Sequence, residues 1–128
     1  MKLIAATSHI AEPEGLKVLA LANDADPRTV PLDGVDRIDL SFPKFTDGRA
    51  FSQAFLLHRR LGFKGEIRAT GDVLVDQLVQ MARSGFDVAV LRADQDLAVA
   101  QAQFDRYKAF YQGDAVTVKP IFARGVAA

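Results

Sequence analysis

Residues 37–53 read RIDLSFPKFTDGRAFSQ, a strand pattern that passes directly into a helix pattern. Over residues 37–42 polar and apolar side chains alternate, which is typical of a strand with one buried face. Pro43 ends this strand because it has no backbone N–H to donate to a neighbouring strand. Apolar residues at helical spacing begin at Phe51. The stretch therefore predicts a strand-to-helix connection.

The same alternation of elements recurs along the chain. Further strand-like runs lie at residues 16–22, 66–70 and 87–91, and helical spacing is found at residues 51–61, 72–84 and 94–112. A glycine follows each predicted helix, as is common at helix ends: Gly62, Gly85 and Gly113. Parallel strands need crossovers of about this length. We predict one α/β domain over residues 1–128 with a mainly parallel sheet, to which the segment at residues 115–122 can add an edge strand that ends at Pro120.

Two of the strands have a polar face, which is unusual for a parallel sheet. Asp39 and Ser41 point away from the apolar side of the first, and Arg68 and Thr70 away from that of the second. Polar lining with helices outside favours βα repeats that resemble an incomplete (β/α) barrel. The alternative is a small three-layer, doubly wound sheet whose polar positions are solvated or form charge pairs between strands. Either arrangement leaves a sheet face poorly covered, which predicts a homo-oligomer or a partner protein.

Composition excludes several classes of function. The chain has 49% hydrophobic and 25% charged residues, and its 16 basic residues equal its 16 acidic ones. Zero net charge does not favour binding to nucleic acid or to a membrane surface. The absence of cysteine excludes disulfides, thiolate nucleophiles and protein-held iron–sulfur clusters. With two histidines we expect no metal site and no evident cofactor, and without a secretory signal we expect a cytoplasmic protein.

The predicted strand ends place charged residues at the C-terminal edge of the sheet, where α/β proteins bind ligands. Thr46 or Asp47 can cap the first helix, and Lys44 and Arg49 flank its start. Free N–H groups and two cations favour a small anion. From the next strand, this interpretation adds Arg68, Asp72, Asp76 and Gln77. The alternative is that the aspartates only cap helices and pair with Arg49 and Arg68.

Five motifs lie within residues 39–87: FPKFTDGR (42–49), Ser52-Gln53, LGFKGEIRATGD (61–72), DQL (76–78) and GFD (85–87). In these motifs the segment resembles domain-of-unknown-function family 934, a bacterial family typically encoded beside assimilatory sulfite reductase. The chain departs from the family before residue 39, where the connection at residues 23–34 is short and rich in Pro and Asp.

The resemblance implies a role in sulfur assimilation and cysteine biosynthesis, in a family whose members are often labelled as possible oxidoreductases. Two hypotheses stay open. One is an accessory protein that acts with sulfite reductase, for which Lys44, Arg49 and Arg68 form a docking patch. The other is a small enzyme or sensor in which these cations bind an anionic sulfur metabolite and Asp47 or Asp72 orients or transfers a proton.

Overall fold

The computed structural model describes residues 1–44 and 48–115. The chain divides into two compact units, Met1–Leu97 and Ala98–Ala128, and each is described by itself. The edge strand predicted at residues 115–122 lies outside the described residues except for Ala115.

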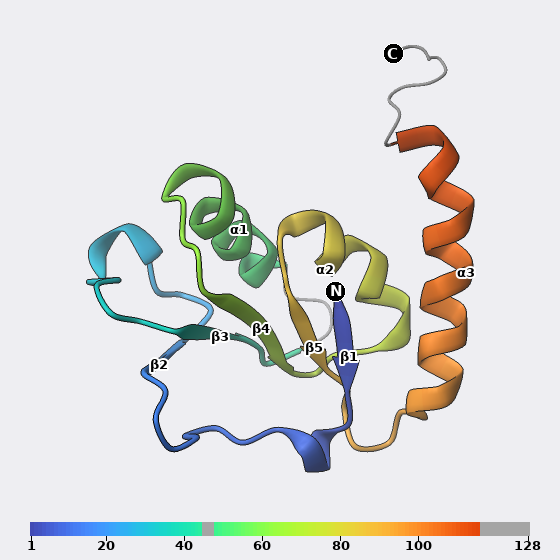
Figure 1. The fold of residues 1–128 in the computed structure, drawn as a ribbon, viewed down its shortest axis with the longest axis horizontal. Coiled ribbons are helices and arrows are strands. Elements are labelled where there is room, and N and C mark those ends of the chain that lie inside the picture. The colour runs from blue at the N-terminus through green and yellow to red at the C-terminus, as the bar shows by residue number, and fades with distance from the viewer. Residues whose placement is uncertain (45–47, 116–128) are drawn as a thin grey trace. The chain divides into compact units, whose positions relative to one another are not determined.

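Five parallel strands form one sheet in the first unit (Figure 1). They are β1 (Lys2–Ile4), β2 (Val18–Leu21), β3 (Arg37–Phe42), β4 (Glu66–Gly71) and β5 (Val88–Val90). Their order is β1-β5-β4-β3-β2. Strands β2 to β5 are neighbours in chain order, and β1 completes the edge beside β5 rather than beside β2. This confirms the predicted parallel α/β sheet with helices between strands.

Both α-helices of this unit cover the same face of the sheet (Figure 1). Helix α1 (Arg49–Phe55) continues into a π-helical turn, η3 (Leu56–Arg60), and connects β3 to β4. A 3-10 turn, η4 (Val75–Gln77), and helix α2 (Leu78–Ser84) connect β4 to β5. Two short 3-10 turns, η1 (Ala6–Ser8) and η2 (Pro27–Thr29), complete the first unit. Helices on one face, with strands in chain order, favour the βα-repeat arrangement over the doubly wound alternative within residues 1–97.

The opposite face of the sheet is crossed by residues 5–17, which join β1 at one edge to β2 at the other (Figure 1). Because the two strands lie at opposite edges, this connection spans the intervening strands. The sequence predicted neither β1 nor this crossing. Three residues are too few to show an alternating pattern.

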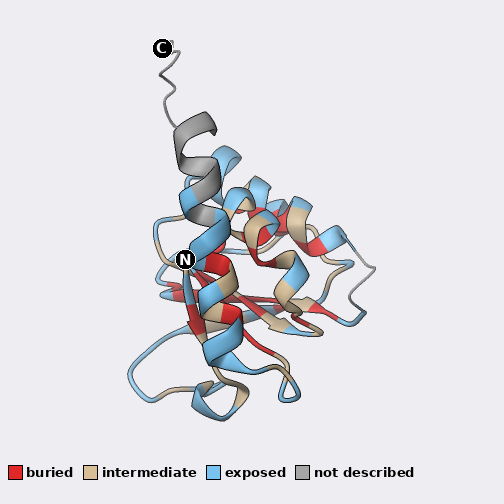
Figure 2. Ribbon diagram, turned by 90° about the vertical axis from the view of Figure 1, so that its right-hand side faces the viewer, coloured by how far each residue is buried: buried red, intermediate tan, exposed pale blue. Residues whose placement is uncertain are grey.

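The core lies between the sheet and its two helices (Figure 2). Ile38, Leu40 and Phe42 of β3 are fully buried, as are Ile67 and Ala69 of β4 to within 1% exposure. These are the apolar positions of the two alternating strands, so the predicted inward face is confirmed.

Glycines, rather than residues with capping side chains, occupy the N-cap of α1 and the C-cap of α2. Gly85 ends α2 with φ of 109°, a left-handed conformation that favours glycine. Gly48 occupies the N-cap position of α1 and provides no side-chain cap. In the second unit the described part is helix α3 (Leu97–Ala115), which starts later than predicted and continues through Gly113.

Candidate functional site

Charged side chains on the face of the sheet opposite the helices form one connected cluster, which we call the sheet-face cluster. Its members are His9, Arg37, Asp39, Glu66 and Arg68. Alternate residues of a strand share a face, so Arg37 and Asp39 lie side by side on β3, and Glu66 and Arg68 on β4. The polar face predicted for Asp39 and Arg68 is thus built from charge pairs within strands rather than between them.

The Arg37–Asp39 pair is the buried centre of this cluster. The Arg37 Nε and Nη2 atoms donate to the two Asp39 carboxylate oxygens at 2.8 and 3.0 Å. Only 3% of Arg37 and 7% of Asp39 is exposed. Arg37 Nη2 also donates to the backbone carbonyls of Ile10 and Ala11, at 2.9 and 3.2 Å. The pair therefore fastens the crossing connection to the sheet.

His9 joins the same connection to β4. Its Nδ1 atom lies 3.0 Å from Nη1 of Arg68, and Arg68 Nε donates to Glu66 at 2.6 Å. Arginine has no acceptor, so the contact requires a neutral His9 that accepts at Nδ1. Nε2 of His9 is 3.8 Å from Asp39. Burial is the largest cause of a lowered pKa at His9, and the positive charges of Arg68 and Arg37 also lower this pKa. The negative charges of Asp39 and Glu66 raise it, but the net shift is downward.

Stability is expected to fall as pH is lowered through the range below 6.5. The folded-state pKa of His9 is lowered from 6.5, so the unfolded state binds more protons there and is favoured. The loss levels off below the folded-state pKa. Chemical denaturation between pH 8 and 5 measures this slope. His9→Gln, whose amide oxygen can still accept from Arg68, should flatten it. An unchanged slope in His9→Gln contradicts the assignment.

A second set of charged residues lies at the C-terminal edge of the sheet. Arg92, two residues after the end of β5, donates to Asp72, directly after β4. The Nε and Nη2 atoms of Arg92 each lie 2.7 Å from Asp94. The guanidinium holds the pKa of Asp94 at about 2, well below its usual 3.8. Sequence reasoning placed Asp72 here and missed Arg92. The available signal was its position just after a strand, which it shares with Lys44 and Asp72.

The structure separates Arg68 from this edge. Phe42 and Gly71 are paired at the ends of β3 and β4, and Arg68 lies three positions before Gly71, opposite Asp39. Its guanidinium contacts Glu66 and His9 instead. Thr70 Oγ1 donates to the Leu40 carbonyl at 3.2 Å. Ser41 and Thr70 are half-buried on the same face.

The residues predicted around the start of α1 divide into three groups. Lys44 is exposed two residues after the end of β3, and Arg49 is the first residue of α1. Thr46 and Asp47 lie outside the described residues. Ser52 is exposed on the helix.

Of three further predicted residues, two form hydrogen bonds within the chain and one is exposed to solvent. Gln53 is 3% exposed, and its Nε2 atom donates to the carbonyls of Ala22 and Ala25, both at 2.8 Å. It therefore ties α1 to the segment after β2. Gln77 accepts from the Leu74 backbone N–H at the start of η4, and Asp76 is exposed.

Residues 1–44 and 48–115 bring together no group of three or more His, Asp or Glu side chains that could hold a metal ion. In the same residues, no helix combines the length and apolar character needed to cross a membrane.

Residues 18–122 match the model of a family described as bacterial protein of unknown function, DUF934. The chain belongs to this family. The match confirms the resemblance seen in residues 39–87 and extends it over most of the chain, including β2 and the second unit's helix. No curated protein and no solved structure matches the DUF934 chain.

Proposed function

We propose that this DUF934 protein is an accessory protein of assimilatory sulfite reduction in cysteine biosynthesis and that it acts in contact with sulfite reductase. The link to sulfite reduction comes from the family resemblance of residues 39–87. Support from the geometry comes from how the arginines of the sheet are used.

The observation that carries the proposal is the neutralisation of these arginines by the chain's own carboxylates. Arg37 pairs with Asp39, Arg68 with Glu66, and Arg92 with Asp72 and Asp94. An oxyanion would have to displace a carboxylate from each guanidinium, which opposes its binding. This arrangement favours a protein that acts through its surface over one that binds a free sulfur anion.

Deletion of the gene in its bacterium tests the role. We expect slower growth with sulfate or sulfite as the sulfur source and normal growth with sulfide or cysteine, because sulfite reductase makes sulfide from sulfite. Binding of the purified chain to purified sulfite reductase, followed by biolayer interferometry, should give a dissociation constant of about 10 µM or lower. Equal growth on all four sources, together with no binding, refutes the proposal.

The second candidate is a small enzyme or sensor for an anionic sulfur metabolite. It is favoured by one feature: the ends of β3, β4 and β5 bring Lys44, Asp72 and Arg92 to one edge of the sheet. Thermal melts with sulfite, sulfate, phosphate and adenosine phosphosulfates test it. A ligand at a hundred times its dissociation constant stabilises by about 2.7 kcal/mol, or roughly 10 °C for a domain of this size. A shift that is lost in Arg49→Ala supports this candidate, and no shift with any anion eliminates it.

A further inference from the structure

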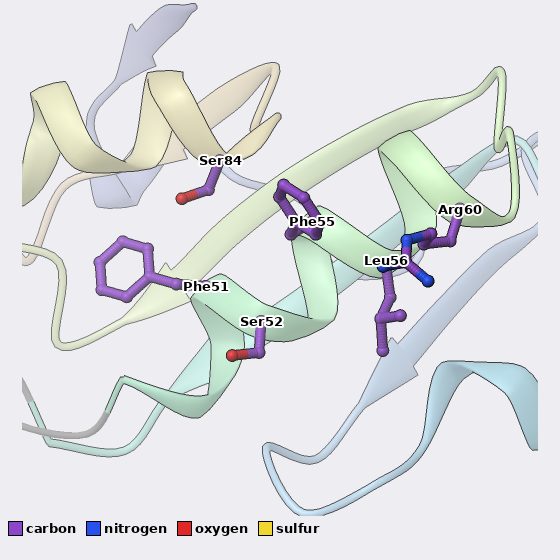
Figure 3. A pocket seen from close by; sticks show the side chains of 6 residues that line it. All are labelled: Phe51, Ser52, Phe55, Leu56, Arg60 and Ser84. Atoms are coloured by element: carbon purple, nitrogen blue, oxygen red, sulfur yellow. The ribbon is translucent and has the colours of Figure 1, made fainter.

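The helix-covered side of the sheet carries an open apolar groove between α1 and α2 (Figure 3). Its volume is about 390 Å³, and it is lined by Phe51, Ser52, Phe55, Leu56, Arg60 and Ser84. Phe55 is 43% exposed, which is unusual for so large an apolar side chain. In Figure 3 the Phe55 ring lies between α1 and the end of α2 where Ser84 is located. All of these residues belong to the first unit.

The residues around this groove have a charge asymmetry that the zero net charge of the chain conceals. Residues 48–65 contain four basic residues, Arg49, Arg59, Arg60 and Lys64, and no Asp or Glu. Residues 77–86 of the facing segment contain Arg83 and again no acidic residue. Of these, Arg60 lines the groove and the Arg59 guanidinium lies over the Phe55 ring, and both side chains are exposed. The groove therefore combines an apolar floor with a basic border formed by these two arginines.

We propose that this groove, with its basic border, binds an acidic amphipathic segment of a partner protein, whose large apolar side chain enters between Phe51 and Phe55. Charge complementarity selects the acidic partner, because opposite potentials across an interface raise the association rate and disfavour wrong partners. The apolar floor requires a side chain that is removed from water on binding. The proposal concerns a different surface from the strand ends and stands whichever protein supplies the segment.

Three other occupants fit the groove less well. A small molecule would be poorly enclosed by so open a site, whereas ligand pockets bury most of the ligand surface. A second copy that used the same groove would place basic residues opposite basic residues, because a twofold interface pairs identical patches. Residues 116–128 of this chain contain Lys119 and Arg124 and no acidic residue, so they lack the complementary charge.

Nucleic acid is the remaining alternative, since exposed aromatic rings can stack on bases. The Phe55 ring already has the Arg59 guanidinium over it, with Cζ 5.5 Å from the ring centroid. A base could stack on this face only by displacing that cation. This contact favours a protein segment, because an apolar side chain can pack against the edge of the Phe55 ring and the neighbouring Leu56 without displacing Arg59.

Selection of the full chain against a phage-displayed library of random dodecapeptides tests the proposal. We expect a consensus that contains Asp or Glu together with Phe, Leu, Ile or Trp. A fluorescein-labelled peptide of that sequence should shift backbone NMR signals of residues 51–60 and of Ser84. A consensus without acidic residues, no consensus at all, or signal shifts confined to other regions overturns the proposal.

Two variants and a matched control locate the binding. Arg60→Glu and Phe55→Ser should each weaken peptide binding about tenfold at low salt, as measured by fluorescence anisotropy. Lys2→Glu reverses an exposed charge on β1 and should leave the affinity within about twofold. Circular dichroism melts establish that each variant folds. If Arg60→Glu binds the peptide as tightly as the unsubstituted protein does, the proposal is contradicted.

Parallel measurements separate the alternatives. A single-stranded 20-nucleotide DNA that binds more tightly than the peptide, with the same loss in Arg60→Glu, would assign the groove to nucleic acid. A dimer in sedimentation equilibrium that Phe55→Ser dissociates would assign it to a second copy. Either result overturns the proposal without affecting the proposed role in sulfite reduction, which rests on the growth test.

Discussion

Replacement of Phe42 by alanine is expected to lower the free energy of unfolding by about 3–5 kcal/mol, the usual cost of truncating a buried phenylalanine. Phe42 is the last residue of β3 and is fully buried. Its ring centroid lies 5.0 Å from that of Phe51 on α1 and 5.7 Å from that of Phe86, which follows α2. The alanine variant would leave a cavity where these elements meet. Urea denaturation followed by circular dichroism measures the change.

Two comparison variants make the Phe42 prediction specific. Phe42→Leu keeps most of the volume and should cost less than about 1.5 kcal/mol, so it remains measurable if the alanine variant does not fold. Phe55→Ala makes the same change at an exposed ring and should cost about 1 kcal/mol or less. If Phe42→Ala were no more destabilising than Phe55→Ala, the packed rings of Phe42, Phe51 and Phe86 would not contribute to stability as expected.

Arg37→Met is expected to destabilise the protein by about 3–5 kcal/mol, because it leaves the buried carboxylate of Asp39 without its main partner. The substitution also removes the donor to the carbonyls of Ile10 and Ala11, which hold residues 5–17 against the sheet. Hydrogen exchange should therefore increase in this connection as well as in β3. Denaturant unfolding and exchange mass spectrometry measure the two effects.

The double variant Arg37→Met/Asp39→Leu provides the decisive comparison. Removing both charges should recover most of the stability, since a buried ion pair can often be replaced by apolar residues at little cost. Arg28→Met breaks the exposed pair with Asp26 and should leave stability nearly unchanged. If the double variant were as unstable as Arg37→Met, the loss would come from the carbonyl contacts and not from the unpaired charge.

The groove and the sheet-face cluster lie on opposite sides of the sheet and differ in character. The cluster is largely buried, its charges are paired within the chain, and it secures a connection. The groove is open, apolar and bordered by exposed cations, with no carboxylate in residues 48–65. The proposed partner recognition and the structural charge pairs thus lie on separate faces, and variants on one face should leave the other intact.

The sequence by itself determined the strands β2, β3, β4 and β5 and the helices between the last three of them. Alternation at Ile38, Leu40 and Phe42, and at Ile67 and Ala69, marks a buried face directly, because side chains alternate along any strand. The glycine at residue 85 likewise marks a helix end through local backbone preference. These are signals that short segments carry without knowledge of the rest of the chain. Family membership was also readable, since its motifs are contiguous.

Only the tertiary structure decided which charged residues meet. The contacts of His9 with Arg68 and of Asp72 with Arg92 join residues 59 and 20 positions apart. Each depends on strand order and register, and no local pattern encodes that β1 lies beside β5. The crossing of residues 5–17 follows from this order. It covers the polar sheet face, which the sequence predicted either as the lining of an incomplete barrel or as solvated or paired positions, and makes it a buried charge cluster. The physical reason is that pairing energy between distant charges depends on a geometry that the whole sheet provides.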